Sequence, residues 1–207
     1  LNFKDLNKNG TLDAYEDWRL PLDKRAKDLL KQMTLEEKVG FMFISTARMK
    51  NDRGTEPGAV PAPITSDFNE EDQVQKNNMF TRKPLPVEMM MSAGTSKGVK
   101  DFHLRHFIFR ANVTAKLIAE WTNKLQALCE TERLGIPAII ASNPRNHITR
   151  DASVGLSVEK TVFSTWPGEL GLSAMNDLSM VRTFANIARQ EWAAVGLPKG
   201  YMYIADL

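Results

Sequence analysis

The first clear pattern along the chain is a stripe of apolar side chains at intervals of three and four residues. Such a stripe is typical of an amphipathic helix that buries one face. It is formed by Ala26, Leu29, Leu30 and Met33. The pattern predicts a helix over residues 22–33, and Thr34 with Glu37 has the spacing of a capping box that starts a further short turn.

Further along, short apolar runs alternate with longer amphipathic stretches. Four runs have the length of strands, at residues 39–46, 105–111, 136–142 and 201–207. The first is apolar almost throughout, which predicts a strand that is buried on both faces. Two long helices are predicted, over 113–132 and over about 178–195, with Gly135 and Gly196 as stop signals, and a shorter helical piece begins at Pro167.

This alternation predicts an α/β fold with a parallel sheet and helices outside it. The chain carries no glycine-rich nucleotide fingerprint, and its four strands fit the first half of a (β/α)8 TIM-type barrel better than a doubly wound sheet. A complete barrel typically needs about 250 residues. We therefore expect an N-terminal segment at 1–21 and a partial barrel at 22–207. The long polar stretch at 47–101 is expected to be an insertion or lid with short elements of its own.

Composition narrows the function classes. The 27 basic residues nearly balance the 25 acidic ones, so nothing favours nucleic acid or an anionic membrane as a partner. No apolar run approaches the ~20 residues of a membrane span. The single cysteine, Cys129, falls on the apolar side of a predicted helix and is expected to pack in the core. The chain starts at Leu1 without a signal peptide, as a trimmed product or a piece of a longer protein would.

Oxygen-bearing residues near the N-terminus have the spacing of an EF-hand calcium loop. Counted from Asp5 as the first position, Gly10 falls on the sixth position, where the loop turns sharply. The expected calcium ligands are Asp5, Asn7, Asn9, Thr11, Asp13 and Glu16. The alternative is a polar N-terminal tail. Because only one such loop is present, we expect a structural Ca²⁺ ion and not a sensor.

Several segments together resemble glycoside hydrolase family 3, the β-glucosidase family. RAKDLLKQMTLEEKVGFM resembles the N-terminal signature of that family, and RHFIFR with NKLQALCETERLGIPAIIASN resembles its second and third barrel strands with the helix between them. FSTWPGELGLSAMNDLSMVRTFANIARQEWAAVG and YMYIAD resemble the helix region and the strand that follow. Some members also begin with a segment that looks like a calcium loop.

The resemblance implies an exo-acting, retaining β-glycosidase in which one carboxylate is the nucleophile and a second is the acid and then the base. In the family both carboxylates come later in the sequence, so we expect them beyond Leu207 and expect no catalytic residue here. The partners implied are a β-glucoside or oligosaccharide substrate, the remainder of the barrel and a C-terminal domain. The chain alone is expected to be inactive, and the whole protein to be secreted or periplasmic.

One loop matches a substrate-binding position of the family. After the LGIP strand most members carry an Asp that binds sugar hydroxyls, and Asn143 stands here instead. Since active sites lie at the carboxyl ends of barrel strands, the neighbouring polar residues are substrate-binding candidates. The candidates are Asn143, Arg145, Asn146 and His147, with Arg110 after the second strand. A loop network that satisfies backbone carbonyls is the alternative for Arg145 and His147.

Two other functions remain open from the sequence. One is a non-catalytic, calcium-dependent binding or assembly module that uses the Asp5 loop to dock a partner. The other is an enzyme of the same family that acts on N-acetylhexosamine or xylose, because the signature residues do not separate these sugars.

Overall fold

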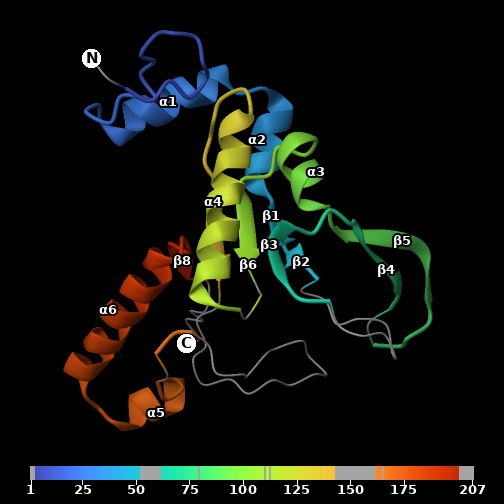
Figure 1. Cartoon of the computed structure of the whole chain (residues 1–207), viewed down its shortest axis with the longest axis vertical. Coiled ribbons are helices and arrows are strands. Elements are labelled where there is room, and N and C mark those ends of the chain that lie inside the picture. The colour runs from blue at the N-terminus through green and yellow to red at the C-terminus, as the bar shows by residue number, and fades with distance from the viewer. Residues whose placement is uncertain are drawn as a thin grey trace. The chain divides into compact units, whose positions relative to one another are not determined.

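The computed structural model describes residues 3–51, 62–78, 80–109, 111, 113–142, 162–164 and 166–200. It shows an α/β fold with a parallel sheet, compatible with part of an α/β barrel (Figure 1). The chain divides into two compact units. The first is built from Leu1–Ser45, Glu70–Phe107 and Leu125–Ala138, and the second from Thr46–Asn69, Ile108–Lys124 and Ile139–Leu207.

The central feature is a four-stranded sheet in the order β1-β6-β7-β8. Its strands are β1 (Ile44–Ala47), β6 (His106–Phe109), β7 (Ile139–Ser142) and β8 (Lys199–Gly200). β7 and β8 run parallel, with Ala141 opposite Lys199. Helix α4 (Ala115–Thr131) connects β6 to β7, and helices α5 (Glu169–Ala174) and α6 (Leu178–Ala194) precede β8. The predicted strand at 201–207 lies outside the described residues.

The predicted strand at 39–46 is wrong in its first half. Helix α1 (Leu22–Gln32) is followed by helix α2 (Leu35–Met42), and β1 begins only at Ile44. The capping box between Thr34 and Glu37 starts α2, and the helix continues into the apolar run as far as Met42. A Cβ added to Gly40 would lie 2.1 Å from the carbonyl oxygen of Phe102, so the bare helix backbone packs closely on that segment. A short apolar run does not by itself distinguish a strand from a buried helix.

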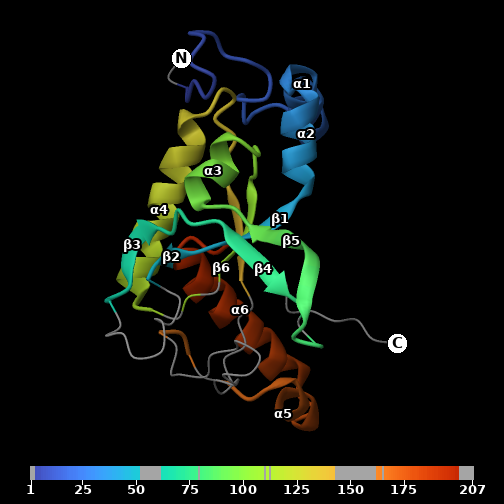
Figure 2. The ribbon, with the colours of Figure 1, turned by 90° about the vertical axis from the view of Figure 1, so that its right-hand side faces the viewer.

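The polar stretch at 47–101 contains short elements, as expected. Its strands form two antiparallel pairs, and its helix α3 (Thr95–Lys100) leads towards β6. The pairs are β2 (Met49–Lys50) with β3 (Thr65–Phe68), and β4 (Gln73–Asn77) with β5 (Pro84–Ser92). Figure 2 shows β4 and β5 side by side as a hairpin. Glu70 accepts hydrogen bonds from the backbone and side chain of Ser96, which ties the segment before the hairpin to α3.

Helix α4 confirms the predicted helix at 113–132. Ile118, Trp121, Leu125 and Cys129 are all at most 1% exposed, so this stripe forms the core around the helix. Cys129 packs in the core, as expected from its place on that stripe. The Trp121 ring lies with its centroid 5.1 Å from that of Phe109 in β6 and 6.1 Å from that of Phe68 in β3.

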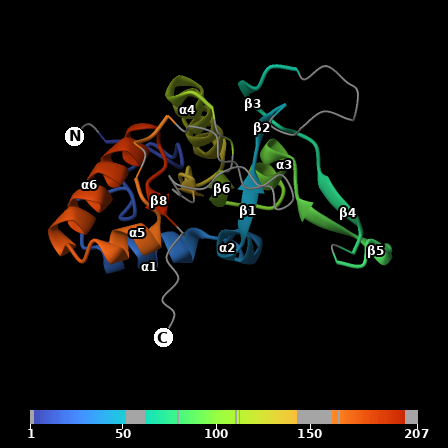
Figure 3. The same cartoon turned by 90° about the horizontal axis from the view of Figure 1, so that it is seen from below.

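Helix α6 confirms the second long helix that the sequence predicted. Asp177 caps its start by accepting hydrogen bonds from the backbone N–H groups of Ser179 and Met180, at 2.9 and 3.1 Å. Its apolar stripe includes the buried Ala188, and Trp166 ahead of α5 packs edge-on against Phe184. Figure 3 shows the short α5 ahead of the long α6. Within the described ranges, no helix is long and apolar enough to cross a membrane.

Candidate functional site

The carboxyl ends of β6 and β7 are tied together by one side chain. Ser142, the last residue of β7, is buried, and its Oγ donates a hydrogen bond of 2.9 Å to the carbonyl oxygen of Phe109, the last residue of β6. In α/β barrels the loops that leave this end of the strands carry the active site. The two strand ends are therefore the fixed points from which any substrate loop departs.

The side chains beneath these strand ends are buried and in aromatic contact. Trp121 is fully buried between Phe109 and Phe68, so the end of β6 rests on a filled aromatic layer. Behind it, the Oγ1 of Thr122 donates to the carbonyl oxygen of Val195 at 2.9 Å, which holds the end of α6 against α4. A substrate loop on such a support begins from a defined position.

The predicted substrate-binding residues lie just beyond these fixed points. Arg110 directly follows β6, and the loop with Asn143, Arg145, Asn146 and His147 directly follows β7. All five residues lie outside the described residues. Their assignment to substrate stays a prediction.

A buried arginine that the sequence analysis missed positions the start of β6. Arg105 is 5% exposed, and its guanidinium donates to the carbonyl oxygens of Val99 at 3.0 Å, Leu104 at 2.7 Å and Ile136 at 2.9 Å. These carbonyls belong to α3, to the approach to β6 and to the approach to β7. The only sequence signal was a charged residue at the edge of an apolar run, which is ordinary at a strand end.

The Asp5 loop adopts a tight, internally bonded conformation. The Asp5 carboxylate accepts hydrogen bonds from the backbone N–H groups of Asn9 at 3.1 Å and Gly10 at 2.8 Å. Gly10 has φ +80°, and Lys8 also lies in the left-handed region with φ 59°. The Oδ1 of Asn9 accepts from the Thr11 backbone at 2.7 Å. The first half of the loop thus folds around the Asp5 and Asn9 side chains.

The second half of the loop closes on the first through carboxylates. Glu16 accepts hydrogen bonds from the backbone N–H groups of Leu6 at 2.6 Å and Asp13 at 3.0 Å. The side-chain amides of Asn7 and Asn9 both donate to Oδ2 of Asp13, at 2.6 and 2.8 Å. The side chains at the third, fifth and ninth loop positions therefore bond to one another, whereas those at the first and twelfth positions bond the backbone of the loop.

The donor set of this loop fits a hard cation by its chemistry, since calcium takes six to eight oxygens from carboxylates, amides and backbone carbonyls. In the part of the chain that the structure describes, no group of three or more His, Cys, Asp or Glu is arranged to hold a metal ion. A calcium ion in this loop would therefore need the Asn7 and Asn9 amide oxygens beside the carboxylates.

The loop is anchored to the last turn of helix α4 and to the residues that follow it. The Nζ of Lys4 pairs with the Glu130 carboxylate, and a Cβ on Gly135 would lie 2.6 Å from the carbonyl oxygen of Leu6. The buried Tyr15 hydroxyl donates to the carbonyl oxygen of Leu134 at 3.3 Å. Burial, reinforced by the neighbouring Glu16 carboxylate, raises the pKa of this hydroxyl above its usual range, so it stays a hydrogen-bond donor.

Curated proteins similar to the chain share one activity in their names. Over 208 residues the chain is 38% identical to the "Periplasmic beta-glucosidase/beta-xylosidase" of Dickeya chrysanthemi. This match covers all of the chain and 27% of that relative. It is 31% identical to "Probable beta-glucosidase C" of Aspergillus oryzae and 32% identical to "Beta-glucosidase C" of Emericella nidulans. These matches cover 92% and 95% of the chain and 25% and 26% of the relatives.

The chain resembles one part of the β-glucosidases. This confirms the resemblance that was predicted from the sequence motifs. The chain spans about a quarter of the length of the curated relatives it matches. No protein-family model matches the chain.

Proposed function

We propose that the chain is the N-terminal part of a retaining, exo-acting β-glycosidase of glycoside hydrolase family 3. The observation that carries this proposal is the 38% identity to a β-glucosidase/β-xylosidase along the whole chain. The parallel sheet and the tied ends of β6 and β7 support it, because they suit the substrate end of an α/β barrel. The nucleophile and the acid/base are proposed to lie in the part of the polypeptide beyond this chain.

In the proposed reaction, this chain binds and orients the sugar while carboxylates from elsewhere cleave the bond. A retaining enzyme places its two carboxyl groups about 5–5.5 Å apart, and hydrogen bonds to the sugar hydroxyls strengthen in the transition state. Asn143 supplies such bonds, because an amide both donates and accepts. Arg145, Asn146, His147 and Arg110 are the further candidates at the same strand ends.

The proposed substrate is a β-linked glucoside or glucose-containing oligosaccharide, with xylosides as a second class. The name of the Dickeya relative carries both sugars, whereas the fungal relatives are named for glucosides only. An enzyme acting on N-acetylhexosamine is the remaining candidate within the family.

The test is activity of the full-length protein on aryl β-glucoside, β-xyloside and N-acetyl-β-glucosaminide. We expect turnover of the glucoside, and we expect Asn143→Ala to lower kcat/KM by about 10- to 100-fold through lost sugar contacts. Asn186→Ala, on the exposed face of α6, is the matched control and should leave kcat/KM unchanged. Turnover by this chain alone, free of trace contaminants, would contradict the proposal, as would no activity of the full-length protein on any of the three.

We also propose that the Asp5 loop binds a structural calcium ion. Its oxygen donors, its left-handed turn at Gly10 and its anchoring next to α4 support a role in fixing the N-terminal segment. The alternative, a non-catalytic module that docks a partner through calcium, predicts partner binding that a chelator abolishes. A secreted or periplasmic location is proposed from the name of the Dickeya relative.

A further inference from the structure

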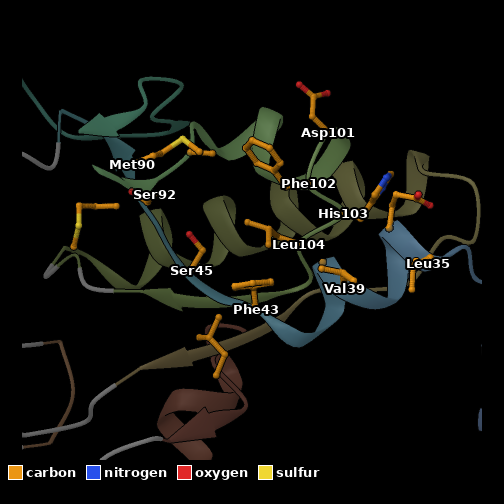
Figure 4. Close-up of a pocket in the computed structure, with 15 residues that line it drawn as sticks. Leu35, Val39, Phe43, Ser45, Met90, Ser92, Asp101, Phe102, His103 and Leu104 are labelled. Atoms are coloured by element: carbon orange, nitrogen blue, oxygen red, sulfur yellow. The ribbon is translucent and has the colours of Figure 1, made fainter. Parts of the chain in front are cut away.

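An apolar groove lies in the first unit, between α2 and the stretch that runs from the end of β5 to the start of β6. It has a volume of about 670 Å³. Figure 4 shows Val39 and Phe43 on one wall and Met90 and Phe102 on the other. These large apolar side chains are all exposed, Phe43 by 62%. We call this feature the amino-end groove.

The amino-end groove is well built despite its exposed walls. Its floor contains the buried Ser92, Leu104 and Gly40, and the backbone of Gly40 packs directly against Phe102 and His103. The acidic side chains of Glu36 and Asp101 lie at its edge. A contiguous apolar surface with a polar rim is typical of an interaction site.

The position of the groove separates it from the proposed substrate site. Its lining residues Ile44 and Ser45 begin β1, and Asp101 to Leu104 come just before β6. The groove thus lies at the amino ends of these strands. In an α/β barrel this end serves stability, whereas substrate binds at the carboxyl ends.

The length of the relatives indicates what covers the groove. They are roughly four times as long as this chain, and their matches to it cover 92–100% of it. Most of a full-length polypeptide therefore lies outside the matched region. In addition, β1 is a terminal strand of the sheet within the described residues, and its first residues line the groove. A terminal strand beside exposed apolar side chains is normally covered in a folded protein.

We infer that the amino-end groove receives an apolar segment of the same polypeptide from outside this chain, flanked by a Lys or Arg that faces Glu36 and Asp101. This inference rests on the proposed function, since both assume a longer polypeptide. The groove is then an internal interface, and burial of Phe43 and Met90 contributes to the stability of the complete protein.

The test is hydroxyl-radical footprinting of the wild-type full-length protein, read by mass spectrometry at single residues. Phe43 and Met90 are expected to oxidise at least about tenfold more slowly than in the urea-unfolded protein. Phe80, which is 90% exposed at the turn of the β4–β5 hairpin, is the internal control and should oxidise at nearly the unfolded rate. This readout does not use glycosidase activity, so it holds or fails independently of the proposed reaction.

Three results would overturn the inference. The first is rapid oxidation of Phe43 and Met90, and the second is a reading frame that encodes no further segment. The third is protection that disappears over about a hundredfold dilution, because a second copy would then be the occupant. A matched pair of variants adds an independent measurement: Phe43→Asp should lower the Tm of the full-length protein by several degrees, whereas Leu22→Asp, on the exposed α1, should not.

Discussion

Thr122 and Gly196 are in such close contact that a Cβ on Gly196 would lie 2.5 Å from the Oγ1 of Thr122. Gly196 ends the turn after α6 with φ +83°, and the same hydroxyl bonds the carbonyl oxygen of Val195. The contact therefore joins α6 to the helix that supports the end of β6. A side chain at position 196 is therefore unfavourable for two reasons: the left-handed backbone conformation and the lack of space for a Cβ.

The first prediction separates these two grounds. Gly196→Ala should destabilise the protein by about 2–4 kcal/mol, because left-handed strain and overpacking add. Gly10→Ala is the matched control: Gly10 has φ +80° but no atom within 4 Å of an added Cβ, so only the strain of about 1–2 kcal/mol remains. Urea unfolding in the presence of a chelator measures the free energy of unfolding of both variants. Equal losses of stability in the two variants would show that a Cβ next to Thr122 has no energetic cost.

The second prediction concerns the metal. Asp5→Ala combined with Glu16→Ala should abolish calcium binding in calorimetry, because both carboxylates leave the loop. The wild-type Tm should rise when calcium replaces a chelator, and the Tm of the double variant should not. Asp23→Ala, an exposed carboxylate on α1, is the control and should keep the calcium response. Identical wild-type melting curves with calcium and with chelator would contradict the proposal of a structural calcium ion.

The third prediction is a pH dependence at the start of α2. Burial would raise the pKa of the Glu37 carboxyl, but hydrogen bonds from Arg133 and the Thr34 backbone outweigh it and hold the pKa below its usual value. A lowered folded-state pKa contributes stability above the unfolded value and loses it as the pH falls. Glu37→Gln should therefore cost about 1 kcal/mol at pH 7, and the difference should shrink below about pH 4.5.

Urea unfolding of wild type and variant across that range measures the third prediction. Glu88→Gln, which removes an exposed pair with Lys76 on the hairpin, is the control and should change little at any pH. A Glu37→Gln deficit that stays constant from pH 7 to pH 3 would mean that the carboxylate charge does not contribute.

The fourth prediction concerns Cys129. Burial raises the pKa of this thiol to about 11, against a partial opposing effect of the Arg105 charge. Alkylation at pH 8 should therefore be at least about a hundredfold slower than in urea, because the thiolate is the reactive form. The pKa of this thiol is higher in the folded than in the unfolded protein, so the neutral thiol contributes to stability at lower pH. This contribution should be lost as the pH rises from about 9 to 11. Fast labelling of the folded protein would contradict this environment.

Long periodic elements were predictable from the sequence, and short ones were not. α4 and α6 match their predicted ranges closely, because an apolar stripe over many turns leaves one interpretation. The run at 39–46 does not match its prediction, since so short an apolar run suits a helix end as well as a strand. The β4–β5 hairpin carries three exposed methionines, Met89 to Met91. Strand β5 lacks the alternation of apolar and polar residues that would have predicted a strand there.

The position of the candidate site at the strand ends was predictable from the sequence, but the long-range contacts that support these strands were not. The ends of β6 and β7 follow from their apolar runs, and Ser142 lies where the third strand was expected to end. The bonds of Arg105 to three carbonyls and the contact of Thr122 with Gly196 join residues far apart in sequence. No local pattern encodes such pairs, because they depend on how distant elements pack.

The anchoring of the Asp5 loop has a consequence for synthesis on the ribosome. The Tyr15 hydroxyl bonds a carbonyl 119 positions later, and the Lys8 ammonium bonds one 123 positions later. The residues of the Asp5 loop thus have no docking surface until the end of α4 has been translated. Attachment of this loop therefore closes a long stretch of chain late in folding.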